Sequence, residues 1–262
     1  MRTQIRAFQI FITLLTCAFL LVPAIQSILA GLTVNYFRGL SSGFTLKWVD
    51  KVWGLYADSV LLSLWLALTC LIVTLIIGVP AAYGLARHQG RMARLLEEFI
   101  SLPLAIPGLA LALALLQLYG SMKGFRTNWT FILVGHVLYT LPFMIRSVLA
   151  VLSAMDLKSL EEGAASLGAS PWQRFRDVIV PNAMPGILAG SLTVVTLSIG
   201  EFNLTWMLHT PYLKTLPVGL ADSYASMRLE IASAYTLIFF VLIVPLLSAM
   251  QWASSRAQRI AS

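Results

Sequence analysis

The stretch LLSLWLALTCLIVTLIIGV, Leu61–Val79, contains no charged side chain. Its polar residues do not alternate with apolar ones, as they would in a strand of a membrane β-barrel. A helix needs about 20 apolar residues to cross the roughly 30 Å hydrocarbon core of a bilayer, and this run with its apolar flanks meets that length. The stretch therefore predicts a membrane-spanning helix, which we place at 58–86.

The same composition extends over the whole chain. Of its 262 residues 58% are hydrophobic and 11% are charged, whereas about 25% are charged in a typical soluble domain. The first apolar stretch resembles a signal-peptide core, but it is longer than about 15 residues and no clean cleavage site follows it, so we expect it to be retained. The sequence predicts an all-α integral membrane protein with one transmembrane domain, 1–262, and six spans at 8–30, 58–86, 98–119, 129–151, 183–208 and 233–255.

Few residues carry the chemistry of an enzyme. Cys17 and Cys70 both lie in predicted spans, which argues against a disulfide framework and favours packing roles. With three histidines and two cysteines in the chain, we find no nucleophile–base constellation and no metal cluster. We therefore expect no catalytic residue and no bound metal. The net charge of +7 is explained by basic residues at membrane edges, so no nucleic-acid partner is expected.

The basic residues predict the orientation. With six spans both termini share a side, and that side would hold 11 lysines and arginines against 7 on the other. Cytoplasmic loops carry the excess of basic residues, so both termini are predicted to be cytoplasmic. Outside the membrane would lie loops at 31–57, 120–128 and 209–232. In the first, Trp48, Val52, Trp53 and Tyr56 would share one face of an interfacial helix, where a membrane-edge anchor is a simpler interpretation than a partner-recognition element.

One polar segment interrupts the hydrophobic sequence between the fourth and fifth predicted spans. LEEGAASLGASPWQRFRDVIVP, Leu160–Pro181, follows an apolar three-to-four spacing that predicts a short amphipathic helix from Asp156. Gly168 stands where such a helix stops. Ser170, Pro171 and Gln173 have the order of a capping box with proline in the first helical position. The segment predicts a helix–turn–helix hairpin at about 153–182; by these features alone, an amphipathic connector lying on the membrane remains open.

This hairpin resembles the signature loop of the membrane subunits of ATP-binding cassette (ABC) importers. That loop reads Glu-Ala-Ala, three residues, Gly, nine residues, Ile, one residue, Leu-Pro. The chain keeps both spacings, with glycine for the first alanine and valines for isoleucine and leucine, and it also holds GILAG at 186–190 and GEF at 200–202. The matching positions are Glu162, Gly163, Ala164, Gly168, Val178, Val180 and Pro181.

The resemblance implies a binding-protein-dependent permease with the type I fold in the bacterial inner membrane, whose cytoplasmic coupling-helix hairpin docks a separate ATPase. It implies as partners an ABC ATPase dimer, a second, non-identical permease, an extracytoplasmic solute-binding protein and membrane lipid. No G-x-x-x-x-G-K-[ST] loop is present, so ATP and Mg²⁺ are expected on the partner ATPase and no cofactor on this chain. The implied solutes are polyamines, organophosphonates or ferric iron. The docking residues implied are Glu161, Glu162, Gly163, Ala164, Gly168, Ser170, Pro171, Trp172 and Arg174.

Glu201 is the acidic residue in the fifth predicted span. A carboxylate at the bilayer centre costs about 2.5 kcal/mol or more, so it should face a cavity or a polar partner. Two interpretations stay open: Glu201 lines the solute route with Asn203 and Tyr139, or it hydrogen-bonds neighbouring helices or holds a subunit interface. His136, Thr140 and Thr205 are further polar candidates nearby, and for His136 an interhelical hydrogen bond is favoured over ligand binding. An ion-coupled secondary transporter using Glu201 as its proton site is the alternative function.

Overall fold

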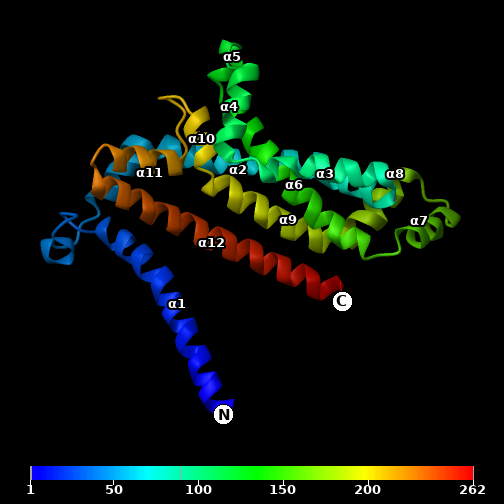
Figure 1. Cartoon of the computed structure of the whole chain (residues 1–262), viewed down its shortest axis with the longest axis horizontal. Coiled ribbons are helices and arrows are strands. Elements are labelled where there is room, and N and C mark those ends of the chain that lie inside the picture. Colours follow the sequence, from blue (N-terminus) through cyan, green and yellow to red (C-terminus); the bar gives the residue numbers. More distant parts are fainter. Residues whose placement is uncertain (1, 89, 262) are drawn as a thin grey trace. The chain divides into compact units, whose positions relative to one another are not determined.

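The computed structural model describes residues 2–88 and 90–261, and most of them are helical. Five helices or continuous helical segments are long and apolar enough to cross a membrane, and one bent pair would make a sixth span. Figure 1 labels them. The long helices are α1 (Arg2–Ala30), α2 (Lys47–Arg87), α3 (Arg91–Ala105), α4 (Gly108–Tyr119), α6 (Trp129–Ser153), α9 (Val180–Gly200) and α12 (Leu229–Ala261). The short ones are η1 (Gly39–Ser42), α5 (Lys123–Arg126), α7 (Leu157–Ser166), α8 (Pro171–Gln173), the π-helical η2 (Arg174–Ile179), α10 (Asn203–Leu208) and α11 (Leu216–Ala225).

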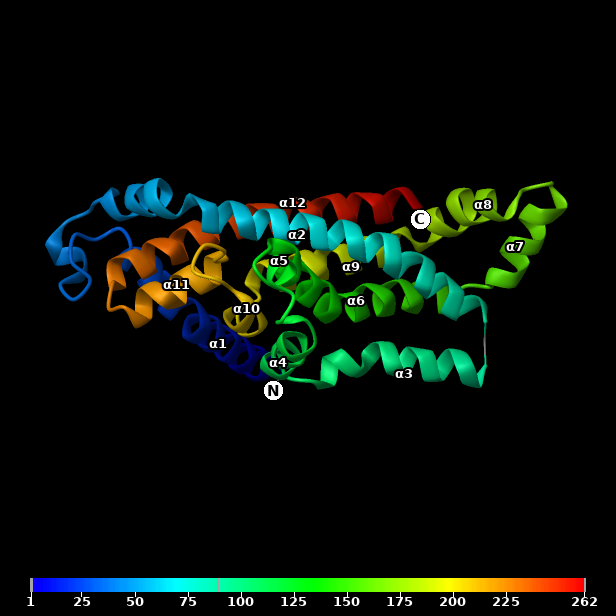
Figure 2. The same ribbon diagram turned by 90° about the horizontal axis from the view of Figure 1, so that it is seen from above.

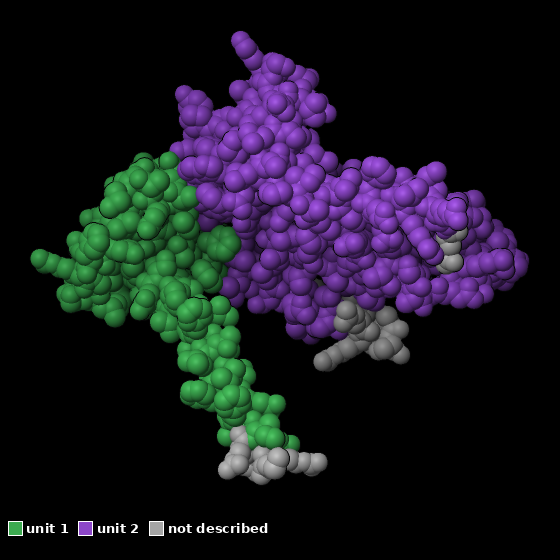
Figure 3. Space-filling view, in the orientation of Figure 1, with its two compact units in different colours: residues 1–57, 219–242 green, residues 58–218, 243–262 purple. Residues whose placement is uncertain are grey.

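The structure is made of two compact units (Figure 3), and the single transmembrane domain expected at 1–262 stays a prediction. Unit 1 comprises residues 1–57 and 219–242, and unit 2 comprises 58–218 and 243–262. Within unit 1, Gly31 approaches the backbone of α12 so closely that an added Cβ would lie 2.7 Å from the Ser233 carbonyl oxygen. The Tyr36 amide donates to the Glu230 carboxylate at 3.0 Å. These contacts hold the end of α1 and the following loop against the start of α12.

The segment expected as an interfacial helix is the first part of α2. Two helical segments meet inside α2 at a kink at Tyr56, where the backbone leaves helical geometry with φ −135° and ψ 17°. Its aromatic face does not have one environment, because Val52 is buried while Trp53 is exposed. The segment before the kink is helical as expected, and its place at the membrane edge stays a prediction.

The third span is not the continuous helix expected at 98–119. The chain turns by 102° between α3 and α4. The residue before a proline avoids the helical region, and Ile106, which precedes Pro107, is extended with ψ 126°. Hydropathy runs through this point unchanged, but the proline ends the helix.

The fifth span also differs from the helix expected at 183–208. α9 ends at Gly200, and Glu201 has an extended backbone with ψ 123° before α10 begins. At its other end the helix starts earlier than expected, because α8, η2 and α9 form one continuous segment from Pro171 to Gly200. The second arm of the hairpin is thus the beginning of the fifth spanning helix.

The core of unit 2 is built on the contact between α6 and α9. A Cβ at Gly186 would lie 2.6 Å from the Ser147 carbonyl oxygen, and one at Gly190 would lie 2.8 Å from the Met144 sulfur. Small residues four positions apart let two helix backbones approach closely. The Ser147 hydroxyl adds a hydrogen bond to the Gly186 carbonyl at 2.9 Å. This contact fixes α6 and α9, the two helices that carry the hairpin.

Candidate functional site: the hairpin between α6 and α9

The first helix of the hairpin has a defined start and a defined stop. The Asp156 carboxylate accepts hydrogen bonds from the Ser159 amide at 3.2 Å and from its hydroxyl at 2.6 Å. The hydrogen bond from the hydroxyl, which has the larger effect, and the hydrogen bond from the amide hold the pKa of Asp156 below its usual value. At the other end Gly168 has a φ of +85°, and the Ala169 amide donates to the Ala164 carbonyl at 3.1 Å. This is a Schellman termination, and it agrees with the helix stop expected at Gly168.

The second arm begins with the capping box expected from the sequence. The Gln173 amide donates to the Ser170 hydroxyl at 3.3 Å, and the Ser170 amide donates to the Gln173 side-chain oxygen at 2.8 Å. Pro171 occupies the first helical position. The π-helix that follows places the side chains of 174–179 off the ordinary helical spacing, a feature that is frequent at functional sites. Local sequence alone therefore specifies the turn and both helix ends.

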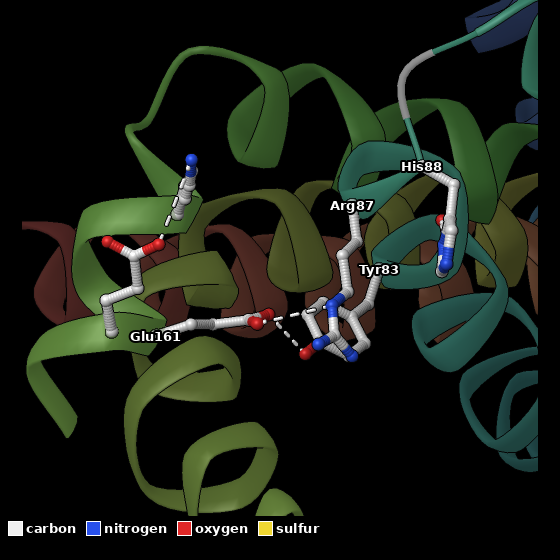
Figure 4. Close-up of polar contacts among 7 residues, drawn as sticks. Tyr83, Arg87, His88 and Glu161 are labelled. Carbon is white, nitrogen blue, oxygen red and sulfur yellow. Dashed lines mark hydrogen bonds and ion pairs between the residues drawn. The ribbon is translucent and has the colours of Figure 1, made fainter. Parts of the chain in front are cut away.

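Glu161 joins the hairpin to the end of α2 (Figure 4). Its side chain is only 10% exposed, accepts a hydrogen bond from the Tyr83 hydroxyl, and pairs with Arg87 Nε at 3.2 Å. Tyr83 and Arg87 are one turn apart at the end of α2, so both reach the same carboxylate. Glu161 was expected among the docking residues, but the structure turns its carboxylate toward its own chain.

The opposite surface of the hairpin is open. Glu162 is exposed and pairs only loosely with Lys158, at 3.9 Å. No atom lies within 4 Å of an added Cβ at Gly163. Leu167 is 90% exposed and Trp172 is 65% exposed, one on each side of the turn. We call this pair the hairpin tip: two large apolar side chains exposed on an otherwise polar hairpin.

Leu167 was absent from the residues expected at the docking surface. The apolar spacing that starts at Asp156 would place Leu167 on the apolar face of the first helix, but Leu167 is the last residue before the left-handed Gly168 and is exposed. The sequence signal for the exposure of Leu167 is its position directly before a predicted Schellman glycine. At that position the periodicity of the helix no longer determines which surroundings the side chain has.

Beneath the hairpin lies a cavity of about 680 Å³. Glu161, Glu162 and Arg174 line it, so it gathers three of the expected docking residues, together with Arg87 and Lys158. The Nε atom of Arg174 is buried without a hydrogen-bond partner. Figure 2 shows α7 and α8 beyond the end of α6, on the side of unit 2 where α2 gives way to α3. The hairpin therefore adjoins the ends of α2 and α6, where a movement of the hairpin can displace these two spanning helices.

The second expected site is centred on Glu201, which the structure makes the cap of α10. Its buried carboxylate accepts hydrogen bonds from the Leu204 amide at 2.7 Å and from the Thr205 amide at 2.8 Å and hydroxyl at 2.6 Å. His136 is buried between the hydroxyls of Ser198 and Thr205, each 2.8 Å away. The polar groups of this region thus pair with one another across α6, α9 and α10.

The other expected route residues lie in different surroundings. Asn203 is exposed and Tyr139 is half-buried, with its ring 6.1 Å from that of Phe143. Thr140 donates to the His136 carbonyl at 2.7 Å within α6. Of the expected route residues, Asn203 and Tyr139 have accessible surface, and Glu201 is buried.

Long apolar helices, two of them broken, with a capped hairpin projecting between α6 and α9, are the architecture of a multi-span membrane protein. The family described as binding-protein-dependent transport system inner membrane component matches residues 75–259. The chain belongs to this family and is a permease subunit of an ABC importer, with an ATPase and a substrate-binding protein as its partners.

Relatives and solved structures agree with this membership. The chain is 28% identical over 247 residues to PhnV of Salmonella typhimurium, a 2-aminoethylphosphonate transport system permease, covering 93% of this chain and 92% of the relative. It is 26% identical to the spermidine/putrescine permease PotC of Escherichia coli, covering 87% and 85%.

Two solved structures share the fold. One is the inward-facing MetNI methionine ABC transporter, with a TM-score of 0.64 and 19% identity, covering 81% of this chain and 99% of that one. The other is a bacterial ABC transporter that imports alginate, with a TM-score of 0.70 and 18% identity, covering 94% and 96%. The expected type I importer fold is confirmed.

Proposed function

We propose that the chain forms one half of a solute pathway, and that the closing motion of its ATPase is transmitted to the chain through the hairpin at 153–182. The observation that carries this proposal is the hairpin tip, where Leu167 and Trp172 are exposed on a turn fixed by a Schellman termination and a capping box. The open space over Gly163 lets a partner's backbone approach the first helix. Such a rigid, partly apolar projection suits insertion into a groove of another subunit.

The Glu161 contact explains how docking would move the membrane helices. A push on the first hairpin helix reaches α2 through Tyr83 and Arg87, while the second arm continues directly into α9. Two spanning helices would then respond to one docking event. ATP and Mg²⁺ would bind to the partner ATPase, and this chain would hydrolyse nothing itself.

The orientation and assembly follow from the same proposal. Both termini and the hairpin would face the cytoplasm, which agrees with the 11-to-7 division of basic residues. A second, non-identical permease would complete the pathway, and an ATPase dimer would contact both hairpins. An extracytoplasmic binding protein would deliver solute to the loops at 31–57, 120–128 and 209–232.

For the solute, we propose a small amine-bearing compound, with organophosphonates first and polyamines second. PhnV and PotC, which match nearly the whole chain, are permeases for solutes of these two kinds. Ferric iron is a third possibility, supported only by the sequence resemblance. Asn203 and Tyr139 are the proposed contacts in the outer part of the route, because both have accessible surface. The ion-coupled alternative is replaced by the ATP-driven mechanism of the family.

The hairpin tip gives the decisive test. Replacing Leu167 by Ser and Trp172 by Ala removes two apolar side chains whose burial contributes about 1.5–3 kcal/mol each. We expect ATPase retention during purification to fall at least tenfold. The matched control is Leu118→Ser, since Leu118 is also exposed but lies on α4, away from the hairpin. Unchanged ATPase retention in the tip variant, with uptake intact, would show that the hairpin is not the docking element.

A further inference from the structure

α3 has two different faces. Arg94, Glu97, Glu98 and Ser101 recur at three-to-four spacing and form one polar stripe. The other face carries exposed apolar side chains, among them Leu95 and Phe99. α3 is the first half of the bent pair that would make the sixth span, so two acidic residues and an arginine on one of its faces need water or a partner along that face. The stripe is therefore the part of the helix that requires an explanation.

The stripe faces a groove shared with α6, which runs alongside α3 (Figure 2). The groove has a volume of about 360 Å³ and is lined by α3 residues and by a single residue of α6, Arg146. In the described part of the chain, neither Arg94 nor Arg146 forms an ion pair within 4.0 Å with Glu97 or Glu98. The α3 residues of the lining are Arg94, Glu97, Glu98, Ser101, Leu102 and Ala105.

The depth of the groove places it within the spanning helices. Arg146 precedes the end of α6 at Ser153 by seven residues, which corresponds to about 10 Å along the helix axis. Ser101 lies ten residues into α3, or about 15 Å from its start. Both helix ends adjoin loops that are proposed to be cytoplasmic. The groove would then open toward the inner end of the solute pathway.

We infer that this groove binds small zwitterions that carry a phosphonate- or phosphate-type anion and a primary amine. Arg146 presents a guanidinium that can bind two anion oxygens at once. Glu97 and Glu98 present carboxylates to the amine, and the Ser101 hydroxyl, which donates to the Glu97 carbonyl at 2.8 Å, can still accept a hydrogen bond from the amine. A simple anion would leave two carboxylates facing it, and a polycation would face two arginines. A volume of a few hundred Å³ is within the range of small-molecule sites.

This inference rests on the proposed function, because it takes the groove as part of the route through the importer. The same chemistry occurs in two sources: a free aminophosphonate and the headgroup of phosphatidylethanolamine. The experiment separates them by the membrane used. The importer complex is purified without nucleotide or binding protein and placed in nanodiscs of phosphatidylcholine and phosphatidylglycerol, or in nanodiscs that also contain phosphatidylethanolamine.

The probe is radiolabelled 2-aminoethylphosphonate. We expect saturable binding in the nanodiscs without phosphatidylethanolamine. Arg146→Gln should weaken this binding at least tenfold. Arg146→Lys should weaken it less, because lysine keeps the charge but cannot form the bidentate hydrogen bonds of arginine. Glu97→Gln combined with Glu98→Gln should weaken binding of this probe but not of methylphosphonate, which has no amine. Arg91→Gln is the matched control, because Arg91 is an exposed arginine of α3 outside the groove. If only phosphatidylethanolamine is retained, and only with Arg146 present, the ligand is the lipid headgroup.

Two results would overturn the inference. One is the absence of both saturable probe binding and Arg146-dependent lipid retention in wild type. The other is equal loss of binding in Arg146→Gln and Arg91→Gln. ATPase retention is measured on the same samples, so that a failure of the docking proposal is seen separately from a failure of the groove. If Arg146→Gln does not assemble, the comparison of Arg146→Lys with Arg91→Gln decides.

Discussion

Replacing Glu161 by Gln should loosen the hairpin from α2 without removing either helix. The variant keeps the size of the side chain and one acceptor oxygen but removes the charge. The carboxylate is buried and accepts a hydrogen bond from Tyr83, and hydrogen bonds to charged groups contribute about 1.5–3 kcal/mol. The ion pair with Arg87 adds at most about 1 kcal/mol, because that arginine is half exposed. Retention of a weaker neutral bond brings the expected loss to about 2 kcal/mol.

Hydrogen–deuterium exchange of residues 157–166 measures this loss directly. A destabilisation of about 2 kcal/mol makes the open form of α7 roughly 30 times more populated, so its amides should exchange about 30 times faster. Glu162→Gln is the matched control, because the neighbouring carboxylate is exposed and its ion pair with Lys158 is loose. A double-mutant cycle with Tyr83→Phe should show that the two changes are coupled.

Two outcomes would refute the reasoning. Exchange that is equally slow in Glu161→Gln and Glu162→Gln would show that the buried carboxylate does not fasten the hairpin. Fully additive effects of Glu161→Gln and Tyr83→Phe would show that the hydrogen bond between them carries no free energy. Either result would leave the continuous helix from Pro171 to Gly200 as the route by which docking reaches the membrane.

Two further changes test the fold and the orientation. Gly186→Val puts a branched side chain where a Cβ alone would lie 2.6 Å from the Ser147 carbonyl oxygen, so we expect a cost of about 2 kcal/mol or more and a lower thermal unfolding temperature. Gly84→Val, at an open helical position, is the control and should be neutral or gain roughly a few tenths of a kcal/mol, because valine has a higher helix propensity than glycine. Cysteines introduced at Ser170 and at the exposed Tyr212, in a background lacking Cys17 and Cys70, should react with an impermeant reagent from opposite sides of the membrane; labelling of Ser170→Cys in intact cells would reverse the proposed topology.

The hairpin could be predicted from the sequence because its structure is local. Gly168 ends a helix through its own left-handed backbone, and Ser170 and Gln173 satisfy each other's amides three residues apart. The direction of Glu161 could not be predicted, because its partners belong to α2, far away in the sequence. Spacing along a helix says which residues share a face, but it does not say which face another helix covers.

The broken spans show a different limit. Hydropathy measures the cost of placing a segment in lipid, and it is equally favourable for a straight helix and for two helices joined at an angle. The break at Pro107 has a local signal in the proline itself. The break at Glu201 has none of this kind, because it depends on a carboxylate that accepts two amides of the following helix. A charged residue within an apolar span predicts a functional site, although such a residue can equally mark the point where the spanning helix ends.

Glu201→Gln separates these two roles. Glutamine keeps one acceptor oxygen, but its NH2 group replaces the other oxygen and faces an amide N–H of α10, so one buried N–H is left unpaired at a cost of about 1–3 kcal/mol. We therefore expect a lower thermal unfolding temperature for the assembled complex, with an unchanged KM for uptake in the fraction that assembles. Asn203→Ala is the matched comparison, because Asn203 is exposed two residues away and its loss should alter uptake without lowering stability. A raised KM in Glu201→Gln at wild-type stability would contradict the capping role, because a carboxylate that only holds α10 in place has no means of changing solute affinity alone, and Glu201 would then belong to the solute route.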